Sequence, residues 1–264
     1  MTSIYGKILE KIFQRHFSEG TTEFVFERAE MAELAAELDI KLPKNLGDVI
    51  YTFRYRRPLP QGIRNQAPEG SDWVITGAGS GRYRFELVDS SISSISPNTN
   101  LAVTKIPDST PGIIREYALS DEQALLAILR YNRLVDIFSG TACYSLQNHL
   151  RTHVRGMGQI ETDEIYVGVD QRGAHYVYPV QAKSGRDKLG IVQIDQDMRM
   201  CHAKFRDLQC RPIGAQFMDD NTIALFEFTK QEGTIRLATE KHYRLVPAHD
   251  LSSEELRRYS QLPQ

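Results

Sequence analysis

The stretch that decides the fold lies at Gly158–Asp197 and reads GQIETDEIYVGVDQRGAHYVYPVQAKSGRDKLGIVQIDQD. Apolar residues alternate with polar or small ones over Asp163–Val169, which predicts a β-strand with Asp163 on its apolar face. Gln171-Arg172-Gly173 is typical of a turn, and Ala174–Ala182 predicts a second strand. A polar, basic turn then leads into Leu189–Met200, whose pattern predicts a helix.

The alternation in the second strand assigns its side chains to two faces. One face carries Tyr176, Tyr178, Val180 and Ala182, and the other carries His175, Val177, Gln181 and Lys183. Because a hairpin lays its strands side by side, we expect Asp163 to lie next to Gln181 and Lys183.

Hydrolysis of a phosphodiester requires an anionic site for Mg²⁺ and a basic group near the attacking water. An acid on one strand, with an amide and a lysine on the next, meets both needs. The pattern resembles the PD-(D/E)XK nuclease superfamily in its QxK form, with Asp163 as the motif's aspartate and Lys183 as its lysine. The resemblance implies that Asp163, Gln181 and the Ala182 carbonyl bind the metal and that Lys183 orients and activates the water.

Gln181 stands where most of this superfamily has a second acid, so another carboxylate is expected to join the site. Glu161 precedes Asp163 by two residues and shares its strand face, which makes it the first candidate. Glu122, early in an upstream helix, is the second. Pro107-Asp108 is a literal "PD", but it is 73 residues from Gln181 and is interpreted as a decoy. Alternatively, Asp163 and Lys183 form a partly buried structural ion pair.

The rest of the second half predicts further elements. Leu119–Phe138 has helical periodicity with Ser120 as a possible cap, and Tyr144–Val154 is predicted as a short helix. Strand-like runs follow Met200, and Asp250–Tyr259 is predicted as a terminal helix capped by Asp250 or Ser252. The order helix, strand, strand, helix, strand predicts an α/β domain over residues 101–264. The resemblance to PD-(D/E)XK nucleases implies that its mixed sheet is restriction-endonuclease-like and flanked by helices.

The first 89 residues show a different order of elements. Helices are predicted over Ile4–Phe17, Glu27–Leu38 and Lys44–Phe53, with a short strand at Thr21–Phe26 and a hairpin from Trp73 to Val88. This order resembles a winged helix-turn-helix domain, and the polar residues 90–100 are interpreted as a linker.

In that family the second helix of the pair enters the major groove of DNA. The resemblance therefore implies DNA contacts by Lys44, Arg54, Arg56 and Arg57. The stretch Lys41–Arg64 holds six basic residues and one acid, although the whole chain has a net charge of −2. Winged helices also serve as dimerisation modules, and an arginine cluster can be only a solvated surface.

The composition indicates a soluble globular protein, with 41% hydrophobic and 25% charged residues. The N-terminus lacks the apolar core of a signal peptide, and no run is long enough to span a membrane. Three cysteines without a CxxC pair indicate neither a disulfide framework nor a common zinc site. A cytoplasmic location is therefore expected.

Together these patterns predict a Mg²⁺-dependent, sequence-specific endonuclease of double-stranded DNA, similar to type II restriction enzymes. Cutting both strands requires two active sites, most simply in a homodimer. One alternative is a nuclease directed at modified DNA, a junction or a repair intermediate, for which Tyr51, Tyr55 and Trp73 are the candidates for an aromatic cage. The other is a DNA-binding regulator without enzymatic activity.

Overall fold

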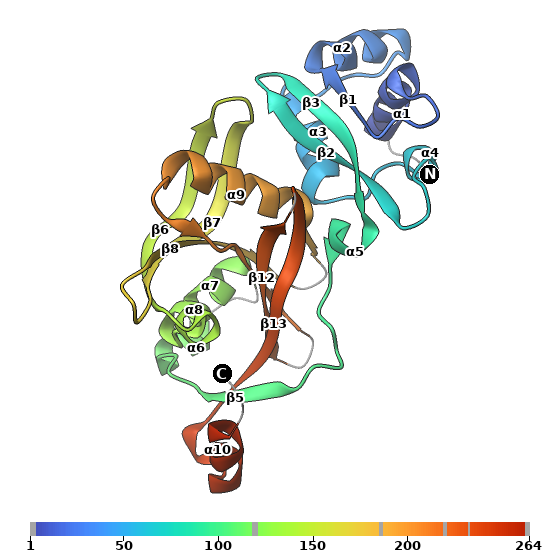
Figure 1. Ribbon diagram of the computed structural model, residues 1–264. Helices are drawn as coiled ribbons and strands as arrows, with labels where there is room; N and C mark the ends of the chain where they lie inside the picture. Colours follow the sequence, from blue (N-terminus) through green and yellow to red (C-terminus); the bar gives the residue numbers. More distant parts are fainter. Residues whose placement is uncertain (1–3, 118–120, 185–186, 219–220, 232, 262–264) are drawn as a thin grey trace. The chain divides into compact units, whose positions relative to one another are not determined.

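The computed structural model describes residues 4–117, 121–184, 187–218, 221–231 and 233–261 and has a mixed α/β fold (Figure 1). Two compact units are present. The first combines Met1–Ile95 with Arg151–Glu161 and Gly190–Ala203, and the second contains the remaining segments. Within the described ranges, no helix is long and apolar enough to cross a membrane.

The first unit has the element order that was predicted for a winged helix-turn-helix. Its elements are α1 (Ile4–His16), β1 (Glu23–Glu27), α2 (Arg28–Glu37), α3 (Leu46–Tyr55), α4 (Gln61–Arg64), β2 (Ser71–Gly79) and β3 (Arg82–Asp89). The three strands form an antiparallel sheet in the order β1-β3-β2. The predicted linker begins with two short elements, α5 (Ser90–Ser93) and β4 (Ser94–Ile95).

Aromatic rings fill the core of the first unit. Phe13 of α1 lies within 5.4 Å, centroid to centroid, of four other rings, those of Phe17, Phe24, Trp73 and Phe85. Such a cluster buries a large apolar area and fixes α1 against both β1 and the β2–β3 hairpin.

A mixed sheet forms the framework of the second half of the chain, in the strand order β5-β13-β12-β11-β8-β7-β6. Its strands are β5 (Val103–Pro107), β6 (Ala142–Val154), β7 (Gly158–Val169), β8 (His175–Lys183), β10 (Gln209–Cys210), β11 (Ile213–Phe217), β12 (Thr222–Gln231) and β13 (Thr234–Val246). Strand β7 pairs antiparallel with β8, and β8 pairs parallel with β11 and β10.

The remaining elements are helices and one short strand. They are α6 (Gly112–Tyr117), α7 (Glu122–Tyr131), α8 (Leu134–Ser139), β9 (Leu189–Gly190), α9 (Ile191–Lys204), η1 (Ala248–Asp250) and α10 (Ser253–Ser260). The helix predicted over Leu189–Met200 corresponds to α9, and the terminal helix is α10, capped by Ser252.

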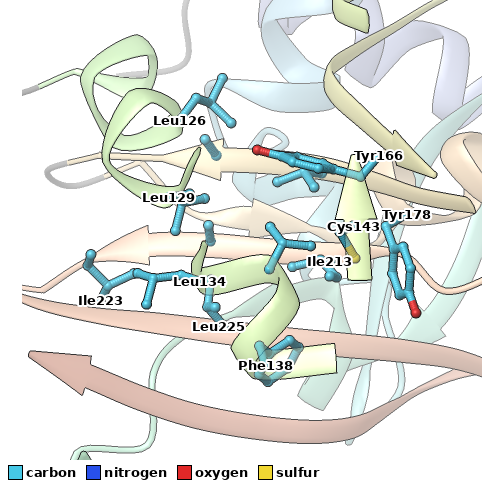
Figure 2. Close-up of a cluster of buried hydrophobic side chains, with 14 of the residues drawn as sticks. Leu126, Leu129, Leu134, Phe138, Cys143, Tyr166, Tyr178, Ile213, Ile223 and Leu225 are labelled. Atoms are coloured by element: carbon cyan, nitrogen blue, oxygen red, sulfur yellow. The ribbon is translucent and has the colours of Figure 1, made fainter. Parts of the chain in front are cut away.

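Helices α7 and α8 cover one face of the sheet and bury its apolar side chains (Figure 2). Leu126 and Leu129 of α7 and Phe138 of α8 meet side chains from the strands, among them Tyr178, Val180 and Ala182. The face of β8 that was predicted to be apolar is therefore the core face, and Gln181 and Lys183 belong to the opposite face.

The single helix predicted over Leu119–Phe138 was wrong, because the chain forms α7 and α8 there. The cause is Asn132, a buried amide that donates to the carbonyl of Ile128 and to Thr110 and accepts from the backbone N–H of Ser109. Arg133 then adopts a left-handed backbone with φ of 49°, which interrupts the helix. Asp121 caps α7, and the predicted cap Ser120 lies outside the described residues.

The helix predicted over Tyr144–Val154 was also wrong, because this segment is the strand β6 beside β7. Leu146, Leu150 and Val154 are spaced four apart, as in a helix, which is the pattern that favoured the wrong prediction. Pairing with β7 supplies backbone hydrogen bonds that a short helix cannot match, so tertiary context overrides the local pattern.

The turn between β7 and β8 is held by Asp170. Its carboxylate accepts the backbone N–H groups of Arg172 and Ala174 at 2.8 and 2.9 Å, and the Tyr176 hydroxyl at 3.1 Å. Gly173 has a φ of 80°, a conformation that glycine adopts without strain. The turn thereby sets the β7–β8 register, in which Glu164 pairs with Val180.

These hydrogen bonds, of which the one from the Ala174 N–H has the largest effect, lower the pKa of Asp170 to about 2. Burial acts in the opposite direction and is outweighed. A carboxylate in the unfolded chain titrates near about 4, so the ionised Asp170 stabilises the fold above that pH. We expect Asp170→Asn to lower the urea unfolding midpoint at pH 6, and the deficit to disappear as the pH falls from about 4 to about 2. The exposed Asp207→Asn variant is the control, and a deficit that stays constant down to pH 2 would contradict the assignment.

Glu164 is a fully buried carboxylate on the core face of β7. The Arg130 guanidinium of α7 donates to it at 3.1 Å, and the Ser145 hydroxyl of β6 donates at 2.6 Å. Burial lowers the pKa of Arg130, but the hydrogen bond to Glu164 and the charges of Glu164 and Tyr166 together outweigh burial and raise the pKa overall. Burial, followed by the charge of Glu164, raises the pKa of Tyr166. The hydrogen bonds of Glu164 to Arg130 and Ser145 thus connect β7 to α7 and β6.

Removal of Arg130 would leave a buried carboxylate without its counter-ion. We expect Arg130→Ala to reduce the free energy of unfolding by about 2 kcal/mol, whereas the exposed control Lys204→Ala changes it little. The double variant Arg130→Ala/Glu164→Gln should recover part of the loss, because the uncompensated charge is gone. Chemical denaturation in a double-mutant cycle measures this, and strict additivity would exclude the ion pair as the cause.

Candidate active site

Asp163 and β8 meet at the end of the β7–β8 hairpin farthest from its turn. The Asp163 carboxylate accepts the backbone N–H of Ala182 through Oδ2 at 2.8 Å. The paired register of β7 and β8 runs from Val169–His175 to Glu164–Val180, so Asp163 and Gln181 are the residues that directly follow its last pair. The structure therefore brings Asp163 next to Gln181-Ala182-Lys183, as the sequence predicted.

Gln181 and Lys183 differ in burial although they share a face. The Gln181 side chain is 1% exposed, whereas Lys183, the last residue of β8, is half-buried. Glu164 and Val180 are directly paired and point to the core side, so by alternation Asp163 and Gln181 both belong to the opposite face. The site thus combines a half-buried carboxylate, a buried amide and a half-buried ammonium on two neighbouring strands.

The two candidates for a second carboxylate occupy different places. Glu161 lies on β7, two residues before Asp163, and forms a salt bridge with Arg151 at 3.2 Å. Glu122 is half-buried in the first turn of α7, the helix that covers the opposite face of β8. Asp108, the acid of the decoy "PD", directly follows β5: its backbone N–H donates to the carbonyl of Val246, and its carboxylate pairs with Arg115.

The donors at Asp163 fit a magnesium site of the open type. Mg²⁺ in such sites takes one or two carboxylates and keeps water or substrate phosphate oxygens as its other ligands. The oxygen donors gathered here are the Asp163 carboxylate, whose Oδ2 accepts the Ala182 N–H, the Gln181 amide and the Ala182 carbonyl. Within the described residues, no cluster of three or more His, Cys, Asp or Glu side chains forms a closed metal site.

The predicted DNA-contacting residues separate into exposed and structural ones. Lys44, Arg56 and Arg57 are exposed around α3. Arg54 is not, because its Nε donates to the carbonyl of Ile75 in β2 at 3.2 Å and its guanidinium lies over the Tyr55 ring. The first three remain candidates for DNA contact, whereas Arg54 attaches α3 to the β2–β3 hairpin.

The candidates for an aromatic cage do not form one. Trp73 is 4% exposed and belongs to the core around Phe13. Tyr51 and Tyr55 contact each other edge to face at 4.8 Å, and the Tyr55 hydroxyl donates to Gln196 at 2.6 Å. Burial raises the pKa of Tyr55. The three rings therefore make contacts within the first unit and do not form a cage.

Two polar residues near the site were missed by sequence reasoning. Glu164 could have been noticed, since alternation places it on the same face as the apolar Tyr166. Gln216 of β11 pairs with Lys183, but that pairing joins strands separated by a helix, so no local pattern reveals it. The second unit also contains a pocket of about 340 Å³, which is lined by Arg130, Ser145 and Tyr166 on the core side, not by Asp163.

Comparison of the chain with protein-family models, curated proteins and solved structures gives no match. The candidate active site is therefore defined by its own geometry, by Asp163 bound to Ala182 between Gln181 and Lys183.

Proposed function

We propose that this chain is a Mg²⁺-dependent endodeoxyribonuclease that cuts double-stranded DNA. The observation that carries the proposal is the 2.8 Å hydrogen bond from the Ala182 backbone to Asp163, which fixes the acid beside Gln181 and Lys183. The order of elements supports it: the helix α7, the strands β7 and β8, the helix α9 and the strand β11 follow one another in the order helix, strand, strand, helix, strand that the PD-(D/E)XK resemblance implies, with α8 and β6 inserted after α7.

Each residue has a role that its position allows. Asp163 and Gln181 would hold the cation against the scissile phosphate, and Lys183 would place a positive charge beside the attacking water, which favours the hydroxide form. When bound, magnesium would polarise that phosphate and neutralise charge that develops on it. Asp163 is fixed by a backbone group, so its carboxylate needs little reorganisation during the reaction.

The finer proposal is a sequence-specific enzyme of the type II restriction kind. The exposed cations around α3, in a unit with the element order of a winged helix-turn-helix, support duplex binding. Cleavage of both strands would use two copies of the site in a homodimer. The three cysteines are free thiols, which fits a reducing cytoplasm. The burial of Trp73 argues against an aromatic cage for modified bases.

Substitution at the site tests the chemistry. We expect Asp163→Asn and Lys183→Ala each to lower the rate of Mg²⁺-dependent plasmid cleavage by about 10²- to 10⁴-fold. Metal-free binding of the same DNA should remain near wild type. The matched exposed variants Asp207→Asn and Lys204→Ala should cut normally. Cleavage by Asp163→Asn at the wild-type rate would refute the proposal.

Substitution near α3 tests the DNA contact. We expect Arg56→Ala/Arg57→Ala to weaken DNA binding and to reduce the slope of log K against log salt by about 2, because each lost phosphate contact removes about one released counter-ion. Lys7→Ala/Lys11→Ala removes the same charge from exposed positions on α1 and serves as the control. Equal effects of the two double variants in fluorescence anisotropy titrations would mean that only net charge matters.

A further inference from the structure

The neighbour of Lys183 on the next strand is Gln216. Strands β8 and β11 run parallel, and their register pairs Gln181 with Gly214 and Lys183 with Gln216. Neighbouring strands lie about 4.8 Å apart, and paired residues project from the same side of the sheet. Gln216 therefore shares the sheet face of Lys183.

The Gln216 amide is buried and has a fixed orientation. Its side chain is 9% exposed, and Nε2 donates to the backbone carbonyl of Asp187 at 3.4 Å. A carbonyl can only accept, so the nitrogen must face Asp187, and the oxygen must face the other way. That oxygen, Oε1, is buried and lacks a hydrogen-bond partner in the part of the chain that the structure describes. Buried carbonyl oxygens in proteins nearly always have a donor.

The residue paired with Gln216 on β8 is Lys183, whose ammonium can donate a hydrogen bond. Its four-carbon stem exceeds the spacing between neighbouring strands, so a change of rotamer is enough to reach Oε1. The other residue of β11 on this face is Gly214, and the Leu189 side chain comes within 2.2 Å of the place where a Cβ would lie. Apolar packing thus occupies the position beside Gln181, and β11 presents its polar side chain at Gln216.

We propose that Gln216 is a positioning residue, whose Oε1 accepts a hydrogen bond from the Lys183 ammonium and holds it on the Asp163 side of the sheet. The contact itself is a property of the metal-free protein. Its catalytic consequence rests on the proposed nuclease function. In that function, a Lys183 side chain that samples several rotamers would orient the attacking water less reproducibly.

The contact is tested first without DNA or metal. Reductive methylation of the folded protein, followed by peptide mass spectrometry, gives the labelling rate of each lysine. We expect Gln216→Leu to label Lys183 about fivefold faster than wild type, the factor that corresponds to one lost hydrogen bond. Gln216→Glu keeps an acceptor oxygen and should label at or below the wild-type rate. The exposed Gln209→Leu variant is the matched control.

Lys105, on strand β5 of the same sheet, is the internal reference. Its Nζ forms a salt bridge with Oε1 of Glu255 at 2.8 Å. A wild-type labelling rate of Lys183 in Gln216→Leu would overturn the proposal. An equal rise at Lys105 and Lys183 would also overturn it, since that would mean that the substitution only loosened the sheet.

The catalytic consequence is read from single-turnover cleavage. We expect Gln216→Leu to cut about tenfold to a hundredfold more slowly with unchanged metal-free DNA affinity, and Gln216→Glu to restore most of the rate. Equal loss in both variants would refute a positioning role. If the wild-type protein cuts no DNA, the proposed function fails, whereas the labelling rates still decide the contact between Gln216 and Lys183.

Discussion

The register of the β7–β8 hairpin is the constraint on which the rest of the site depends. The side-chain period of a strand is two, so a slip by one residue would turn Asp163 to the core face and Glu164 to the opposite one. Either exchange would bury a carboxylate without its partners. The Asp170 turn at one end and the Asp163–Ala182 hydrogen bond at the other fix this register from both sides.

The two faces of β7 separate two carboxylates with different tasks. Glu164 faces α7, where Arg130 and Ser145 both donate to its Oε1 and where it connects three elements. Asp163 faces away from that core, where it is half-buried. One strand thus supplies a structural acid and a candidate catalytic acid at adjacent positions. This arrangement requires that the core side be sealed by α7 and α8, as Figure 2 shows.

The sequence predicted those features that depend on local pattern. The alternation of apolar and polar residues was enough to predict the hairpin, its turn and the position of Asp163 next to Gln181-Ala182-Lys183. The catalytic roles of these residues stay a prediction. Local pattern was not enough for Asn132, whose hydrogen bonds to Ser109 and Thr110 divide one periodic stretch into α7 and α8. Nor did it reveal β6, whose helical spacing yields to pairing with β7. The contact of Arg54 with Ile75 and the pairing of Gln216 with Lys183 were not predicted for the same reason, because in each case the two partners lie far apart in sequence.

The first unit is built from three separate segments of the chain, and this has a consequence for biosynthesis. That unit includes Arg151–Glu161 and Gly190–Ala203 in addition to its first 95 residues. Chains emerge from the ribosome N-terminus first, and domains generally fold as units. The first unit cannot gather all its parts until residue 203 has been made, when β5, β6, β7 and β8 of the large sheet exist but β10 to β13 do not. The two units are thus interdependent during synthesis, and a fragment that ends at Ile95 would lack two segments of its own unit.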